Sequence, residues 1–382
     1  MRIAVLTGGG DVPGLNVAIK AVASRAHERG WQVLGIRRGW LGLLGVDPAN
    51  PASLAEWTMP LGPLDVRTID RTGGTILHTS RVDPQKLPKV LAPERLRASF
   101  GAAEAIDATP HVKAAIAALK LDAIVALGGD GTLRFAARLS AEGLPVISIP
   151  KTMDNDVHGT DYAIGFSTAI TRSVESVTAL RTTAGSHERI LIVELFGRYS
   201  GQTALYTGLL ASADRTFIAE APFDLGLAAT LLEADRRASP SHYAVAIVSE
   251  GARPIGGQLI ERGAADASGR KHLGGIGEIL GAACRALTPE GVIVQNLAYL
   301  MRAGAADATD HMIALSFGNM AVELLAAGRG GRMCALRDGD FKSVPIDAPL
   351  NGPKRLDVAA VYDTANYRAR LRRIEGLSLF GV

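Results

Sequence analysis

Two polar loops, each directly after a short apolar run, constrain this chain more than any other part of its sequence. Residues 124–127 (I-V-A-L) lead into G-G-D-G-T at 128–132, and residues 146–149 (V-I-S-I) lead into P-K-T-M-D-N-D at 150–156. Short apolar runs bounded by such loops are typical of buried parallel strands. Because ligands bind outside the carboxyl ends of parallel strands, both loops are expected to face one crevice.

The first loop has the composition of a phosphate-binding site. Glycines let backbone N–H groups approach phosphate oxygens, and the helix expected from about Thr132 points its positive end at them. A second glycine loop, G-G-G-D-V-P-G-L-N at 8–16, follows another strand-like run. The chain lacks G-x-x-x-x-G-K-[ST] and a clean G-x-G-x-x-G with a following acid, so neither a P-loop nor a dinucleotide site is indicated.

The second loop carries residues suited to acid–base chemistry, namely Lys151, Thr152, Asp154, Asn155 and Asp156. In an extended loop the two aspartates project to the same side, where one can accept a proton from a hydroxyl while the other orients a neighbour or a metal-bound water. Taken alone, the segment also fits a turn in which Asp and Asn bind their own backbone. Both loops together favour phosphoryl transfer.

Strand-like and helix-like stretches alternate along nearly the whole chain, which predicts an α/β protein with parallel sheets covered on both faces. A length of 382 residues predicts two lobes. Besides the two strands above, strands are expected at residues 3–7, 33–36, 190–195, 216–219, 243–248 and 292–295, and helices at 17–29, 111–119, 167–180, 225–238 and 309–326.

Composition excludes several kinds of partner. The formal charge of +3 and the absence of a long basic run argue against nucleic acid. No stretch approaches the roughly 18 apolar residues of a membrane span, and the N-terminus lacks the pattern of a signal peptide. Cys284 and Cys334 lie far apart without metal-like spacing, which fits a reducing compartment. A cytoplasmic enzyme with neither a nucleic-acid nor a membrane partner is therefore expected.

Eight ordered motifs resemble those of the 6-phosphofructokinase family, from Ile3 to about Arg332. They are G-G-D-V-P-G-L-N, G-G-T-I-L-H-T-S-R (73–81), G-G-D-G-T, P-K-T-M-D-N-D, G-T-D-Y-A-I-G-F, S-H-E-R-I (186–190), V-E-L-F-G-R (193–198) and V-S-E-G (248–251). A NAD or lipid kinase could share G-G-D-G-T, but would not be expected to carry P-K-T-M-D-N-D and S-H-E-R-I as well.

The resemblance implies a fold and a reaction. The fold is two three-layer α/β/α lobes with mostly parallel sheets. The donor lobe is expected at residues 1–165 plus about 300–350, and the sugar-phosphate lobe at 166–299 plus about 351–382. The implied glycolytic reaction moves the γ-phosphoryl group of ATP to the 1-hydroxyl of fructose 6-phosphate, with Mg²⁺.

The resemblance also implies roles for individual residues. Asp154 matches the base that takes the sugar hydroxyl's proton, and Asp130 matches the acid that engages Mg²⁺. Arg198 and Arg81 match arginines that stabilise the charge of the transition state, while Thr152 and Asp156 assist the base. The donor is assigned to Gly9, Arg81, Gly129, Asp130, Gly131, Thr132 and Lys151, and the sugar phosphate to Thr152, Asp154, Arg189, Phe196, Gly197, Arg198, Glu250, Tyr299 and Arg302.

Arg189 resembles an arginine that reaches the sugar phosphate of a neighbouring subunit, so a homodimer or homotetramer is expected.

Two further positions concern the phosphoryl donor. A glycine after G-G-D accompanies ATP in this family, whereas an aspartate there accompanies pyrophosphate; a carboxylate would crowd and repel a nucleotide's α-phosphate. Gly131 therefore favours ATP, although Lys151 resembles the pyrophosphate-dependent branch, which stays an alternative.

Some positions depart from the family pattern. Many members have L-G-x-x-Q-R-G-G where this chain has L-A-Y-L-M-R-A-G (297–304), and Ile293 stands where a cation for the sugar 6-phosphate is usual. Phe196 replaces a methionine. Lys20 keeps a charge of the bacterial effector site, but Ser24 stands where an arginine is common. Another ketose phosphate as acceptor, or a non-catalytic metabolite sensor, therefore remain alternatives.

Overall fold

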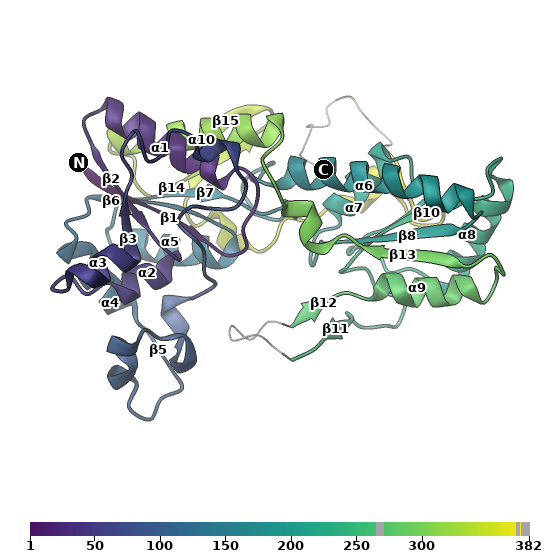
Figure 1. Cartoon of the computed structure of the whole chain (residues 1–382), viewed down its shortest axis with the longest axis horizontal. Helices are drawn as coiled ribbons and strands as arrows, with labels where there is room; N and C mark the ends of the chain where they lie inside the picture. The colour runs from purple at the N-terminus through teal and green to yellow at the C-terminus, as the bar shows by residue number, and fades with distance from the viewer. Residues whose placement is uncertain (265–270, 372–374, 376–382) are drawn as a thin grey trace.

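The computed structural model describes residues 1–264, 271–371 and 375, which form two α/β lobes side by side (Figure 1). The first lobe is built on a seven-stranded sheet in the order β15-β14-β7-β6-β1-β2-β3. Its inner strands are parallel, and only the edge strands β3 and β15 run antiparallel to their neighbours. The strands are β1 (Arg2–Gly8), β2 (Gln32–Ile36), β3 (Thr58–Pro60), β6 (Ala123–Gly128), β7 (Val146–Pro150), β14 (Arg332–Arg337) and β15 (Asp340–Pro345).

Helices cover both faces of this sheet because its strands are apolar on both sides. Val5 and Val125 pack into the core under α1 and α10, whereas Ala4 and Ile124 pack into the core under α2, α4 and α5. The helices of this lobe are α1 (Leu15–Glu28), α2 (Trp40–Gly45), α3 (Pro51–Trp57), α4 (Thr109–Ala118), α5 (Asp130–Ala141) and α10 (Ala308–Ala326).

The second lobe has a four-stranded parallel sheet in the order β13-β8-β10-β9. Helix α6 packs on one face, and α8 and α9 pack on the other. The fold is thus the predicted α/β class. Its elements are β8 (Ile190–Leu195), β9 (Arg215–Phe217), β10 (Ala244–Ser249), β13 (Val292–Asn296), α6 (Phe166–Ser186), α7 (Gln202–Leu210), α8 (Leu225–Ala238) and α9 (Ile276–Arg285).

Short hairpins and 3-10 turns complete the described chain. The expected boundaries shift by a few residues: α5 begins at Asp130, α6 continues to Ser186, and β9 ends at Phe217. The small elements are β4 (Leu87–Pro88), β5 (Ala105–Ile106), β11 (Glu261–Arg262), β12 (His272–Leu273), α11 (Val358–Val361), β16 (Tyr362–Asp363), β17 (Arg368–Ala369), η1 (Ile69–Arg71), η2 (Pro84–Lys86), η3 (Lys89–Leu91), η4 (Glu94–Phe100), η5 (Ala298–Arg302) and η6 (Ala348–Asn351).

The chain crosses between the lobes at several places. Helix α6 follows the loop after β7, and Asp310 of α10 holds its start by accepting hydrogen bonds from the amides of Gly165 and Thr168, at 2.7 and 2.8 Å. After β15 the chain returns, and Tyr362 and Tyr367 pack into the core of the second sheet. Within the described residues, no helix is long and apolar enough to cross a membrane.

Candidate active site

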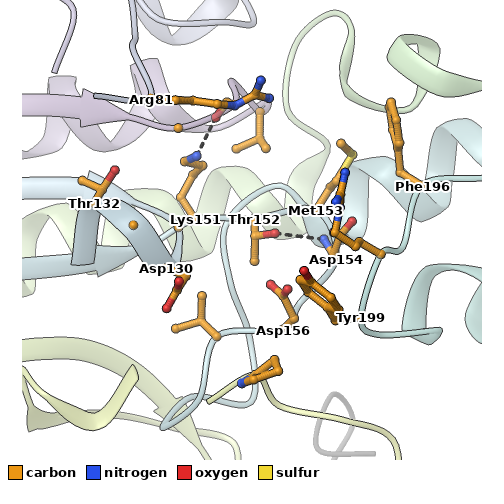
Figure 2. A pocket seen from close by; sticks show the side chains of 18 of the residues that line it. Arg81, Asp130, Thr132, Lys151, Thr152, Met153, Asp154, Asp156, Phe196 and Tyr199 are labelled. Carbon is orange, nitrogen blue, oxygen red and sulfur yellow. Dashed lines mark hydrogen bonds between the residues drawn. The ribbon is translucent and has the colours of Figure 1, made fainter. Parts of the chain in front are cut away.

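A cavity of about 890 Å³ lies between the carboxyl ends of the two sheets, and both loops singled out in the sequence open into it (Figure 2). Its lining draws on segments from both lobes. The lining residues that the sequence predicted are Gly9, Arg81, Gly129, Asp130, Gly131, Thr132, Lys151, Thr152, Asp154, Asp156, Phe196, Arg198, Glu250, Tyr299 and Arg302.

The glycines of the first lobe allow a close approach of helix α5 to the sheet. A Cβ at Gly8 or Gly128 would lie 2.4 or 2.3 Å from the Thr132 side chain, so any larger residue would displace the first turn of α5. Gly9 has a φ of 85°, which a side chain would strain, and its amide donates to the Ser80 carbonyl at 2.8 Å. Because its own amide is engaged, Gly9 shapes the turn, while the N-terminus of α5 at Asp130 and Gly131 faces the cavity as phosphate binding requires.

Three cations meet beside Gly10. Lys151 is almost fully buried, and its Nζ donates to the Gly10 carbonyl at 2.5 Å (Figure 2). A Cβ on Gly10 would lie 2.6 Å from Arg302 Nη1 and 3.7 Å from Arg81 Nη2. Burial, with Arg302 and Arg81 nearby, lowers the pKa of Lys151 to about 7. Asp11 offsets this charge only in part, with its Oδ1 3.6 Å from Arg302 Nε. The excess of positive charge in this part of the cavity favours the binding of an anion.

The loop after β7 is a turn, one of the two conformations that the sequence left open. Asn155 has a φ of 51° and is fully buried, because its side chain accepts from the Ala163 amide and donates to Gln202 and to the Asp161 carbonyl, each at 2.8 Å. Of the two interpretations that the sequence left open, the turn is the one observed. The turn nevertheless leaves both Asp154 and Asp156 in the cavity wall.

Asp154 is a carboxyl group of the cavity whose pKa is strongly perturbed. Burial raises its pKa well above the usual value, and the neighbouring charges of Asp156 and Glu250 raise it further. The Arg198 backbone amide and guanidinium act in the opposite direction. Within the described residues, the buried Oδ1 of Asp154 has no hydrogen-bond partner. A buried, unpaired carboxylate oxygen in a cavity is poised to accept a proton from a ligand.

The second lobe adds Glu250 and Arg198. Burial raises the pKa of Glu250 to about 7, although the Arg198 charge and the Gly197 amide oppose this rise. The Arg198 Nη2 donates to the Lys271 carbonyl at 2.7 Å, which fixes the guanidinium at the cavity wall. One arginine among several acids suits a polar, uncharged part of a ligand, such as sugar hydroxyls.

Aromatic rings close the same side of the cavity. Phe196 and Tyr299 pack edge to face with centroids 5.8 Å apart, and the Arg302 guanidinium lies 4.8 Å from the centroid of the Tyr299 ring. This stacking is a cation–π contact and orients Arg302 toward Gly10. Tyr299 thus joins the aromatic wall to the cationic cluster.

Two predicted residues do not line the cavity. Arg189 lies at the start of β8, where its Nε donates to the Glu290 carbonyl at 3.1 Å. Gly197 lies behind the wall: a Cβ there would lie 2.7 Å from both the Ser200 carbonyl and Ser249 Oγ. Gly197 therefore contributes through its amide to Glu250 and not through contact with a ligand.

Several lining residues were not singled out from the sequence, namely Asp11, Arg134, His158, Tyr199, Lys271 and Arg355. Asp11 and Tyr199 lie inside or next to quoted motifs, so motif membership was a usable signal for them. Arg355 comes from the returning segment after β15, and Lys271 directly precedes β12. Nothing in the local sequence connects these two with the glycine loops.

Asp130 is the exposed acid at the start of α5, and Arg134 pairs with it at 3.0 Å. Its charge helps burial to raise the pKa of Asp156. Within the described ranges there is no group of three or more His, Cys, Asp or Glu residues suited to hold a metal. Mg²⁺ usually needs only one or two carboxylates together with substrate phosphates and water. Asp130 with Asp156 fits that requirement.

Comparison with known proteins identifies the class of protein that this fold and cavity define. The family model for phosphofructokinase matches residues 2–325, and the chain belongs to the phosphofructokinase family. It is 39% identical to an ATP-dependent 6-phosphofructokinase of Chloroflexus aggregans, over 90% of each chain. It is 38% identical to a pyrophosphate–fructose 6-phosphate 1-phosphotransferase of Amycolatopsis methanolica, over 95% of this chain and 99% of the relative.

Solved structures agree with this assignment. Phosphofructokinase from Saccharomyces cerevisiae superposes with a TM-score of 0.73 at 25% identity, covering 92% of this chain. The present chain spans about half of that longer chain, 45% of its length. A pyrophosphate-dependent phosphofructokinase from Marinobacter aquaeolei gives a TM-score of 0.75 at 19% identity, over 97% of this chain and 89% of the other, and so shares the fold.

Proposed function

We propose that the protein transfers the γ-phosphoryl group of ATP to the 1-hydroxyl of fructose 6-phosphate, giving fructose 1,6-bisphosphate in glycolysis. The observation that carries this proposal is Asp154, which lines the cavity with the glycine loops and the cationic cluster, and whose Oδ1 is buried without a partner in the described chain. Membership of the phosphofructokinase family supports the reaction class.

The side of the cavity lined by the first lobe, the donor half, holds the triphosphate of ATP. The backbone amides at the N-terminus of α5, at Gly131, offer donors to the phosphate oxygens, and the turn at Gly9 lets the chain approach them closely. Arg81 and Lys151 supply positive charge near the transferring group, where negative charge spreads in the transition state. Asp130 and Asp156 would hold Mg²⁺, which supplies neutralisation of the donor phosphates when bound.

The sugar half prepares the acceptor. Asp154 takes the proton of the 1-hydroxyl as its oxygen attacks the γ-phosphorus, and the leaving group is ADP. Its raised pKa makes it a stronger base than an exposed aspartate. Glu250 accepts from sugar hydroxyls, Arg302 binds the sugar phosphate, and Arg198 stabilises the transferring group. Thr152 orients the base, since its Oγ1 accepts from the Asp154 amide at 3.2 Å.

The donor is proposed to be ATP because Gly131 leaves room for it. No atom lies within 4 Å of a Cβ built on Gly131, so the space beside the first turn of α5 is open. Pyrophosphate is the second candidate, favoured by the buried Lys151 and by relatives that carry that name. Both donors should be offered in parallel with Mg²⁺ and a panel of ketose phosphates. The proposal expects ADP and fructose 1,6-bisphosphate; turnover with pyrophosphate alone would overturn the donor, and turnover with another ketose phosphate alone would overturn the acceptor.

We propose further that the lobe with the seven-stranded sheet, residues 1–165 plus about 300–350, holds the donor, and that residues 166–299 plus about 351–382 hold the sugar. Residues 265–270, 372–374 and 376–382 of the second range lie outside the described residues. Arg189 lies outside its own cavity and is assigned to the cavity of a neighbouring subunit in a homodimer or homotetramer. Mixing Asp154→Asn and Arg189→Ala chains by co-refolding should restore part of the activity. The molar mass can be measured by light scattering during turnover. A monomer with full activity would contradict this assignment.

A further inference from the structure

Glu194 is a buried carboxylate that the proposed mechanism does not use. On strand β8, Ile190 and Ile192 point into the apolar core under α8 and α9, and Glu194 is the next residue in the same alternation. Only 2% of Glu194 is exposed. A charge at a core position is costly unless it is fully hydrogen-bonded, so its presence needs a reason.

The carboxylate accepts hydrogen bonds from two separate segments. Gly275 donates to Oε1 and Oε2 at 2.9 and 3.0 Å, and Gly277 donates to Oε2 at 2.8 Å, both at the start of α9. Asn296, at the end of β13, donates through Nδ2 to Oε1 at 3.0 Å. A Cβ on Gly274 would lie 2.8 Å from Oε1, so the chain passes directly over the carboxylate.

Both segments lead into the cavity wall. Upstream of Gly275 lies Lys271, whose carbonyl accepts from the Arg198 guanidinium. Downstream of Asn296 lies η5, which carries Tyr299 and Arg302. Glu194 therefore binds both segments that position the arginines of the sugar half: the segment before α9 contacts Arg198, and the segment after β13 carries Arg302.

We propose that Glu194 is a positioning residue that fixes Arg198 and Arg302 by holding the starts of α9 and η5. This inference rests on the proposed function, because it takes the two arginines to contact the sugar phosphate and the transferring group. Glu194 touches neither ligand. Its position matters because small displacements of catalytic groups can slow a reaction strongly.

Substitutions can remove all the hydrogen bonds to the Glu194 carboxylate, or only the one from Asn296. Glu194→Gln keeps the shape but cannot accept from all its partners, and Glu194→Leu removes every acceptor. We expect kcat to fall roughly 10-fold in the first and about 100-fold in the second, with an unchanged KM for ATP. Asn296→Ala removes only the side-chain hydrogen bond toward η5, since the Leu297 amide still donates to the Glu194 carbonyl at 3.1 Å, and it should raise the KM for fructose 6-phosphate while changing kcat little.

The pH profile gives a readout that a merely structural role would not move. The Glu194 charge helps to raise the pKa of Glu250. In Glu194→Gln, the sugar-phosphate affinity that depends on ionised Glu250 should therefore extend to lower pH than in the wild type. Binding of fructose 6-phosphate, measured by calorimetry across pH, reports this shift without turnover.

The matched control is Glu233→Gln on α8. Glu233 is also buried in the same lobe and holds Arg236 and Arg237 at 2.8 and 2.6 Å, away from the cavity. It should lose thermal stability with unchanged kinetic constants. If the folded Glu194 variants keep wild-type kcat and pH profile, or if the KM for ATP and all other constants worsen together, the positioning role is wrong. If the wild type binds no sugar phosphate, the proposed function fails instead.

Discussion

The two halves of the cavity are built on different principles. The donor half follows β1, β6 and β7 of one sheet, and its wall combines the glycines of two loops with the cations Lys151 and Arg81. The sugar half uses side chains from β8, β10 and η5, with Glu250 at a raised pKa and Arg198 beside it. Asp154 lies in the loop between them, which places the base where the two halves meet.

This difference separates two tasks. Backbone amides and fixed cations hold an anion whatever nucleoside is attached to it, while acids with raised pKa values can move protons and bind hydroxyls. Substitutions in the donor half should therefore change donor affinity and choice, and substitutions in the sugar half or the connecting loop should change the chemical step. The following experiments test that division.

The largest effect is expected at Asp154. Asp154→Asn removes the base but keeps its size, so kcat should fall about 10²–10⁴-fold while sugar-phosphate binding stays nearly unchanged. Stopped-assay kinetics and calorimetry measure the two quantities. Asp340→Asn, at an exposed position of β15, is the control and should behave as the wild type. Retained activity in Asp154→Asn would remove the residue from its role.

Next in size is the donor choice at Gly131. Gly131→Asp places a carboxylate in open space beside the donor site, and like-charge repulsion should lower kcat/KM for ATP roughly 10-fold to 100-fold relative to pyrophosphate. Gly131→Ala tests the added bulk without the charge and should have a small effect. An unchanged donor ratio in Gly131→Asp would break the link between this glycine and ATP.

A tenfold change in donor affinity per pH unit is expected from the titration of Lys151. Its pKa of about 7 means that the free site loses this positive charge as pH rises through 7. Donor binding then requires proton uptake, so donor affinity should fall about tenfold per pH unit above 7 in the wild type. Lys151→Met should bind more weakly below pH 7 and show a flatter profile above it. Identical profiles in both proteins would contradict the assignment.

The smallest effect is expected at Arg134. Its pair with Asp130 is exposed on both sides, at 55% and 59% of the side chains, and such pairs contribute only about 0.2–1 kcal/mol. Arg134→Gln should strengthen Mg²⁺ binding less than fivefold by freeing Asp130, and should leave the sugar constants unchanged. A titration of activity against Mg²⁺ at fixed ATP measures this, and a change in sugar affinity would contradict the division between halves.

Much of the donor half could be predicted from the sequence because its residues lie in short, continuous motifs. G-G-D-G-T and P-K-T-M-D-N-D follow adjacent parallel strands, so sequence order and spatial order agree. The sequence left the turn at Asn155 as one of two possibilities, because Gln202, which helps to stabilise its left-handed backbone, lies far along the chain. The support of Arg198 by the Lys271 carbonyl was equally hidden, since no side-chain pattern marks a backbone acceptor.

The central claim is that donor and sugar occupy one cavity with the 1-hydroxyl next to the donor's phosphates. Replacing Mg²⁺ by paramagnetic Mn²⁺, with a non-hydrolysable imido analogue of ATP, allows a direct test by nuclear magnetic resonance of bound fructose 6-phosphate. The C1 protons should be broadened more than the C6 protons, both in the wild type and in Asp154→Asn. Equal broadening, or none, in a complex that binds both ligands would contradict the account.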